Sequence, residues 1–213
     1  MTTAPRVTRK NPLQVVLVAD DSGSMSGEPA KQVTEGLQDF IAKLQSFGRG
    51  EKSFFRILFV TFGDQPKVVH EFADILGVTA DTFKVTGQSG GTNMDVALAM
   101  VATKMEQNRP QSESDPAPLV IFWSDGQNTG GDPLPAAQRI KSLQCPCGRT
   151  PLLITCGFGQ AERQLLEPMA TSPEHFKLFQ SAQELEVFLG NVGTLVTTAG
   201  KSMDQVREDI KEL

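Results

Sequence analysis

Apolar runs that alternate with amphipathic stretches are the feature of this sequence that most constrains its fold. Continuous apolar runs of strand length predict buried β-strands, here at 13–19, 54–62, 118–124 and 151–158, with shorter strands at 67–72 and 175–179. Apolar residues at helical spacing predict helices between them, at 29–47, 94–108, 134–143, 161–168 and 181–192. Strands that alternate with helices favour a doubly wound α/β fold, with a mostly parallel six-stranded sheet and helices on both faces.

One strand is expected to run against the others. The turn "GDQP" separates the strand at 54–62 from the run "KVVHEF" at 67–72. So short a connection joins antiparallel strands, whereas parallel strands need a longer crossover. We therefore expect 67–72 to be an antiparallel strand at one edge of the sheet.

A chain of 213 residues is long enough for one large domain. We expect a flexible N-terminal arm at 1–12, the domain at 13–198, and a charged C-terminal helix or tail at 199–213. That last segment has apolar residues at helical spacing, so it either folds back onto the domain or docks on a partner.

Composition excludes several classes of function and location. A net charge of −5 argues against binding of nucleic acid, and no apolar run approaches the ~20 residues of a membrane span. Three cysteines without framework spacing favour a reducing, cytoplasmic location.

Three polar loops share one position in the predicted sheet. The segments "DDSGS", "GGTN" and "SDG" each lie between a strand and a helix or just before a helix. In open α/β sheets such loops gather beyond the carboxyl ends of the strands. Together they supply five side chains with oxygen atoms and none with nitrogen or sulfur: Asp20, Ser22, Ser24, Thr92 and Asp125.

Oxygen ligands select a hard cation, Mg²⁺, Mn²⁺ or Ca²⁺. Asp20, Ser22 and Ser24 alternate, so an extended turn would point all three the same way. Two carboxylates offset the two positive charges of the ion, and three hydroxyls leave one octahedral position for water or another ligand. An acidic side chain of a protein partner suits that position.

The segments "DDSGSM", "GGTNMD" and "WSDG" resemble the metal-ion-dependent adhesion site of von Willebrand factor type A domains. The resemblance extends from about residue 13 to 195, and the running text is most similar to bacterial proteins of tellurium-resistance (TerY-type) operons. It implies that Ser22, Ser24 and Thr92 bind Mg²⁺ or Mn²⁺ directly, with Ca²⁺ less favoured, and that Asp20 and Asp125 bind directly or through water.

The resemblance also implies a function without catalysis. A partner's Asp or Glu would complete the metal shell, and the bacterial branch suggests a scaffold in stress-response or kinase/phosphatase-linked assemblies. We expect the surrounding loop residues to form the partner-binding rim: Asp21, Gly27, Glu28, Gln88, Asn93, Gln127 and Asn128.

Enzyme classes fit the motifs less well. A receiver-type or other metal-dependent phosphoryl-transfer protein remains the alternative, because paired acids after a first strand also bind Mg²⁺ there. That class needs an acceptor aspartate at the end of the middle strand, and Asp64 follows in a predicted turn instead. A serine hydrolase would need a central serine where "GSMSG" has Met25. His70 and His175 lie away from the loops, and we expect them to be structural.

Overall fold

The computed structural model describes residues 5–47, 54–159, 161–198 and 201–213. Six strands form one sheet in the order β3-β2-β1-β4-β5-β6. Five of them run parallel, and β3 pairs antiparallel with β2 at one edge. The strands are β1 (Leu13–Asp20), β2 (Phe55–Phe62), β3 (Pro66–Asp74), β4 (Leu119–Ser124), β5 (Leu152–Phe158) and β6 (Phe176–Phe179). The predicted fold class is confirmed, including the antiparallel edge strand.

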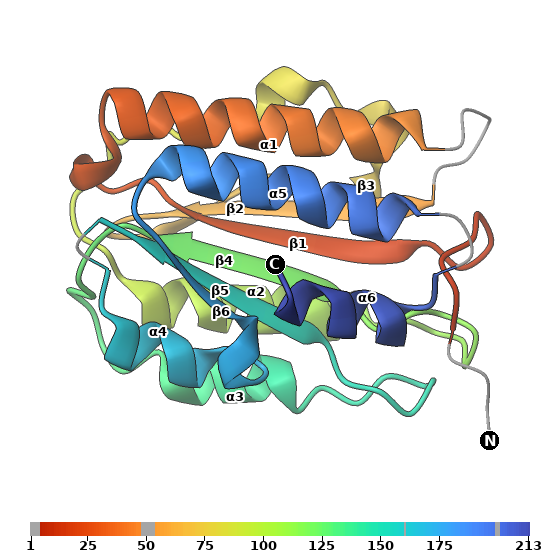
Figure 1. Cartoon of the computed structure of the whole chain (residues 1–213). Coiled ribbons are helices and arrows are strands. Elements are labelled where there is room, and N and C mark those ends of the chain that lie inside the picture. Colours follow the sequence, from red (N-terminus) through yellow and green to blue (C-terminus); the bar gives the residue numbers. More distant parts are fainter. Residues whose placement is uncertain (1–4, 48–53, 160, 199–200) are drawn as a thin grey trace.

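Helices cover both faces of the sheet (Figure 1). On one face lie α1 (Glu28–Ser46), α5 (Ala182–Thr197) and α6 (Met203–Lys211), and on the other lie α2 (Met94–Gln107), α3 (Leu134–Lys141) and α4 (Arg163–Met169). Alternate residues of β1 enter the two cores: Val15 and Leu17 pack toward α1, and Val16 and Val18 pack toward α2. This double burial is the reason that the central strands are apolar without interruption.

Local sequence sets where the helices begin. Gly27 has φ 80°, a left-handed conformation that glycine adopts at little cost, and Pro29 follows in the first turn of α1. Ser181 caps α5 by accepting a hydrogen bond from Glu184 N at 3.3 Å. The segment 181–184 has the Ser-x-x-Glu spacing of a capping box, but Glu184 Oε2 accepts from Gln180 N and not from Ser181 N, so the second bond is shifted by one residue.

Several predicted boundaries differ from the structure by a few residues. The largest difference is at α5, which continues to Thr197 where the sequence suggested an end near 192. His175 precedes β6 in a 3₁₀ turn and does not lie on the strand.

The C-terminal helix folds back onto the sheet. Met203, Val206 and Ile210 of α6 are buried in the same core cluster as β1 and α5. Of the expected N-terminal arm, residues 1–4 lie outside the described residues, and Val7 packs against this same cluster. The division of the chain at residues 12 and 198 stays a prediction.

No helix in the described residues is long and apolar enough to cross a membrane.

Candidate metal centre

The first loop of the candidate site turns sharply after β1. Residues Gly23–Met25 form a 3₁₀ turn, in which Met25 N donates to Ser22 O at 3.0 Å and the Met25 side chain is buried. The expectation of an extended turn is therefore wrong. The hydroxyls are still brought together, because Ser22 Oγ and Ser24 Oγ lie 3.0 Å apart.

The second and third loops meet the first one at Ser24. Ser24 Oγ donates to Asp125 Oδ1 at 2.7 Å, which joins the β1–α1 loop to the β4–α3 loop. A Cβ atom built on Gly126 would lie 3.6 Å from both Ser24 Oγ and Thr92 Oγ1, so these two hydroxyls flank the same point. The structure thus brings together the five residues that the sequence predicts: Asp20, Ser22, Ser24, Thr92 and Asp125.

Asp20 is fully buried at the end of β1. Its Oδ1 accepts from Ser22 N at 2.9 Å, and its Oδ2 accepts from the Ser124 hydroxyl. Burial raises the pKa of Asp20 to about 6, although the hydrogen bonds from Ser124 and Ser22 act to lower it. Burial likewise raises the pKa of Asp125, against the hydrogen bond from Ser24. Among the described residues these two desolvated carboxylates have no basic partner, and a bound cation would stabilise such an arrangement.

The Thr92 loop is held from two sides. Thr92 N donates to Thr129 Oγ1 at 2.7 Å, and Thr129 N returns a bond to Thr92 O at 3.0 Å. On the other side, Gly91 N donates to Asp64 Oδ1 at 2.6 Å. The position of the Thr92 hydroxyl therefore depends on residues of the β4–α3 loop and of the β2–β3 turn.

The seven expected rim residues divide into two groups. Four are exposed: Gly27, Glu28, Gln88 and Gln127. The other three are half-buried and engaged within the protein, namely Asp21, Asn93 and Asn128.

Asp21 holds the loop that leads to Thr92. Its Oδ1 accepts from Gly87 N at 2.7 Å and from Thr86 N at 2.5 Å. These contacts indicate that its carboxylate anchors this loop.

Sequence reasoning missed three supporting residues, Ser124, Thr129 and Asp64. Ser124 stands next to Asp125 in "WSDG", so its hydroxyl was a visible signal. Thr129 and Asp64 carry no such signal, because their partners come from a different loop.

Other metal-binding or reactive groups are less well placed. The described residues contain no group of three or more His, Cys, Asp and Glu side chains that could hold a metal ion. All three cysteines are free, and burial raises the pKa of Cys145 to about 11. His175 Nδ1 lies 2.7 Å from Ser172 Oγ and its Nε2 lies 3.1 Å from Arg207 O, in keeping with the expected structural role. Trp123 is buried in the core beneath the site.

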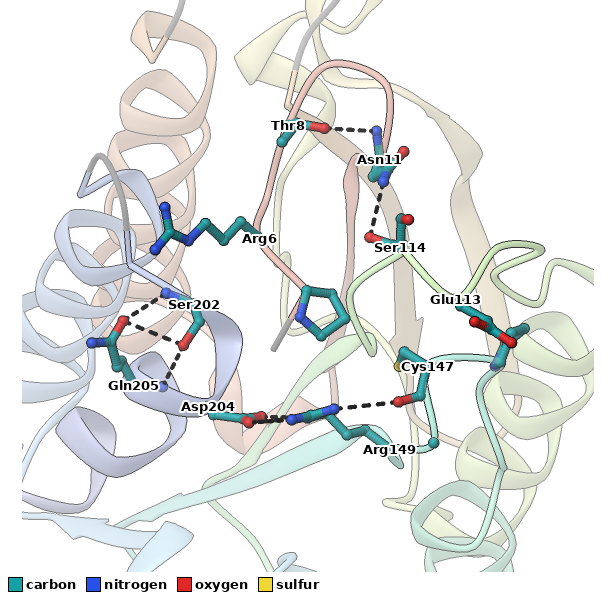
Figure 2. A pocket seen from close by; sticks show the side chains of 13 residues that line it. Arg6, Thr8, Asn11, Glu113, Ser114, Cys147, Arg149, Ser202, Asp204 and Gln205 are labelled. Carbon is teal, nitrogen blue, oxygen red and sulfur yellow. Dashed lines mark hydrogen bonds and ion pairs between the residues drawn. The ribbon is translucent and has the colours of Figure 1, made fainter. Parts of the chain in front are cut away.

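A polar pocket of about 1080 Å³ lies at the other end of the sheet, near the starts of β1, β4 and β5 (Figure 2). Arg149 crosses it and pairs with Asp204, with Nη2 2.6 Å from Oδ2. This pocket shares none of the five oxygen-bearing residues.

Comparison with known proteins identifies the same architecture in other proteins. Residues 14–191 match the family model of the von Willebrand factor type A domain. Human inter-alpha-trypsin inhibitor heavy chain H4 is 31% identical over 162 residues, which cover 73% of this chain and 17% of that protein. The chain therefore spans less than a fifth of this relative.

Solved structures share the fold at low identity. The pilus adhesin SpaC from Lactobacillus rhamnosus GG superposes with a TM-score of 0.71 at 16% identity, over 91% of this chain and 31% of that chain. Proximal thread matrix protein 1 from the mussel byssus, solved with a zinc-occupied MIDAS motif, superposes with a TM-score of 0.66 at 18% identity, over 88% of this chain and 46% of that one.

Proposed function

The chain belongs to the von Willebrand factor type A domain family, and on that premise we propose that it binds a protein partner through a divalent cation. Domains of this family typically mediate metal-dependent interactions or adhesion. One observation carries the proposal for this chain. Oxygen-bearing side chains from three loops converge where two buried carboxylates have no basic partner in the part of the chain that the structure describes.

Ser22, Ser24 and Thr92 would bind the cation directly, and Asp20 and Asp125 would bind it directly or through water. The ion would supply a Lewis-acidic position that accepts one further oxygen ligand. The existing hydrogen bonds among Ser22, Ser24 and Asp125 support this assignment, because they already hold the ligand oxygens close together.

Mg²⁺ or Mn²⁺ suits the site better than Ca²⁺. Five protein oxygens leave one position of an octahedral ion, whereas Ca²⁺ takes six to eight ligands and a looser shell. The mussel protein with zinc in its MIDAS motif supports divalent binding in principle.

An Asp or Glu side chain of the partner would take the open position. Carboxylate is the protein ligand that Mg²⁺ and Mn²⁺ prefer, and it brings the negative charge that the neutralised site lacks. Gly27, Glu28, Gln88 and Gln127 are exposed around the loops and would contact the partner next to that carboxylate.

For the biological setting we propose a cytoplasmic scaffold in a bacterial stress-response system, resembling the tellurium-resistance or kinase/phosphatase-linked assemblies. The similarity of "DSGSM", "GGTNMD" and "WSDG" to TerY-type proteins supports this setting. The role is recognition and not catalysis, as is general for this family.

Calorimetric titration of metal-stripped protein with MgCl₂ and MnCl₂ tests the site. We expect saturable one-site binding, weakened about tenfold or more in Ser24→Ala and Asp125→Ala. Asp81→Ala is the matched control, since it removes an exposed carboxylate from a 3₁₀ turn outside the three loops.

Binding that survives both site variants would overturn the assignment of the five residues. If the wild-type protein alone does not bind metal, the titration is repeated with excess acetate. Binding that appears only with acetate means that the carboxylate completes the site, and its absence there as well would reject the metal centre.

A further inference from the structure

The end of the sheet that carries the candidate metal centre, called the metal end from here on, differs in charge from the opposite end. Four loops that follow strands at this end, and the loop that precedes α2, contain no lysine or arginine in the sequence: 21–27, 63–65, 125–133 and 159–162, and 86–93. The same segments contain Asp64, Asp132 and Glu162 besides the acids already described, and Glu28 begins α1 directly after Gly27.

Two of these acids belong to segments that hold or carry residues of the candidate site. Asp64 Oδ1 accepts from Gly91 N, the residue before Thr92. Asp132 is exposed in the loop that carries Asp125, and its Oδ1 accepts from Leu134 N at 2.9 Å. Both carboxylates bond to neutral backbone groups in these contacts, and neither forms an ion pair among the described residues.

Asp95 adds a further acid beneath the β4–α3 loop. Its Oδ1 is buried and has no hydrogen-bond partner among the described residues. A Cβ atom on Gly130 would lie 2.5 Å from this oxygen, so the carboxylate faces the backbone of the loop that follows Asp125.

The charges of the ion and of the side chains around it determine which partner segments can approach the site. Asp20 and Asp125 offset the two charges of the ion. The remaining acidic side chains then give the surface around the site a net negative charge. The nearest basic residues in the sequence lie just beyond these loops: Lys31, Lys67, Lys84 and Arg163. Arg163 is paired with Glu167, with Nε 2.9 Å from Oε2. At the opposite end of the sheet, the segments before the strands instead carry Arg6, Arg9, Lys10, Arg109 and Arg149, two of which line the pocket in Figure 2.

We infer that the partner segment carries a single Asp or Glu among lysine and arginine residues, and that acidic tracts are rejected. This inference rests on the proposed function. The cation attracts one carboxylate at contact distance, whereas the surrounding acids repel further negative charge and attract flanking positive charge. Discrimination of this kind comes from repulsion of the wrong partner as much as from attraction of the right one.

Three labelled peptides of equal length test the inference by fluorescence anisotropy in MnCl₂. Each has one central Asp, flanked by Ser and Lys, by Ser alone, or by Ser and Glu. We expect affinity to fall in that order, and the Lys-flanked peptide should bind about tenfold more tightly than the Glu-flanked peptide at low salt. This difference in affinity should become smaller at about 0.5 M NaCl, because salt screens the exposed charges of the rim. EDTA should abolish the binding of all three peptides.

The double variant Glu28→Gln/Asp132→Asn removes two rim charges and leaves the five metal-site residues in place. We expect it to keep the Mn²⁺ affinity of the wild type and to lose most of the peptide discrimination. The control variant Asp81→Asn/Glu113→Gln makes the same change of charge away from the metal end. It should retain the full difference in affinity between the Lys-flanked and Glu-flanked peptides.

Two adverse outcomes have different meanings. Metal-dependent binding with no preference, or with a preference for the Glu-flanked peptide, overturns this inference and leaves the proposed function standing. Absence of metal-dependent binding by all three peptides overturns the proposed function and this inference with it.

Discussion

Ser24 Oγ donates a hydrogen bond of 2.7 Å to Asp125 Oδ1 and thereby joins two loops that are 101 residues apart in the sequence. Ser22 Oγ, 3.0 Å from Ser24 Oγ, extends the same chain of oxygens. Because the groups that would bind the cation already contact one another, little side-chain ordering is left for the metal to impose. Preorganisation of this kind raises affinity by lowering the entropic cost of binding.

Ser124→Ala should weaken the metal site without touching a proposed ligand. The Ser124 hydroxyl donates to Asp20 Oδ2 in a fully buried position, so its loss leaves a buried carboxylate oxygen without that donor. We expect a loss of about 1–3 kcal/mol in the free energy of unfolding and about a tenfold loss in Mn²⁺ affinity, measured by urea denaturation and calorimetry.

The control for Ser124 is Ser142→Ala, which removes an exposed hydroxyl that donates to Arg139 O at the end of α3. It should change the free energy of unfolding by less than about 0.5 kcal/mol. Unchanged Mn²⁺ affinity in Ser124→Ala would show that this hydroxyl does not position Asp20.

The pH dependence of stability should reverse when metal is bound. The pKa of Asp20 is raised from 3.8 to about 6, so the metal-free folded state holds this proton more tightly than the unfolded state does. The stabilisation is complete below pH 3.8 and is lost as pH rises through 6, which amounts to about 3 kcal/mol from this group. A cation needs the ionised carboxylate, so Mn²⁺ should stabilise the protein far more at pH 7.5 than at pH 5.

Asp20→Asn separates these two effects. The neutral amide should make the metal-free protein more stable than the wild type at pH 7.5, and it should remove the response to Mn²⁺. Urea denaturation at pH 5, 6 and 7.5, with and without MnCl₂, measures both. A wild-type protein whose metal-free stability rises between pH 5 and pH 7.5 would contradict the assignment of Asp20 as the dominant titrating group.

Thr129→Val should lower Mn²⁺ affinity through the backbone of Thr92. Thr129 Oγ1 accepts from Thr92 N at 2.7 Å, and valine has nearly the same shape but no acceptor. We expect about a tenfold loss of affinity by calorimetry, and Thr129→Ser should restore most of it. Equal affinities in the valine and serine variants would mean that shape alone holds the loop.

The strands were predictable because burial on both faces makes them apolar without interruption, and the helices because burial on one face places apolar residues at helical spacing. Asp20, Ser22 and Ser24 could be identified as site residues since their chemistry is concentrated in one loop. The role of Asp21 could not be identified from the sequence. Its partners Thr86 and Gly87 lie about 65 residues away and donate through backbone N–H groups, which leave no mark in a sequence. The placement of α6 was also open, since an amphipathic helix fits its own domain and a partner equally well.

Two helical glycines at the contact between α1 and α5 should respond in opposite ways to alanine. A Cβ atom on Gly36 would lie 2.8 Å from Glu186 Cα, which is backbone and can yield only if the helices move apart. On Gly190 it would meet Lys43 Nζ at 2.9 Å, the mobile end of a long side chain. We expect Gly36→Ala to lower the free energy of unfolding by about 1–3 kcal/mol. Gly190→Ala should raise it by up to about 1 kcal/mol, because alanine favours the helix. Equal effects of the two substitutions in urea denaturation would contradict the close packing of α1 on α5.

Ile210→Ala should show whether α6 belongs to the folded domain in solution. Ile210 is fully buried in the core cluster, so its truncation should cost about 2–4 kcal/mol of the free energy of unfolding. Leu213 follows the same helix but is 42% exposed, and Leu213→Ala should leave the free energy of unfolding within about 0.5 kcal/mol of the wild type. Urea denaturation of both variants measures the difference. A large loss for Ile210→Ala alone would extend the domain beyond residue 198 to the end of α6, because truncating a side chain on a detached helix would not change the stability of the sheet. Equal stabilities would instead show that α6 leaves the core in solution and is free to meet a partner.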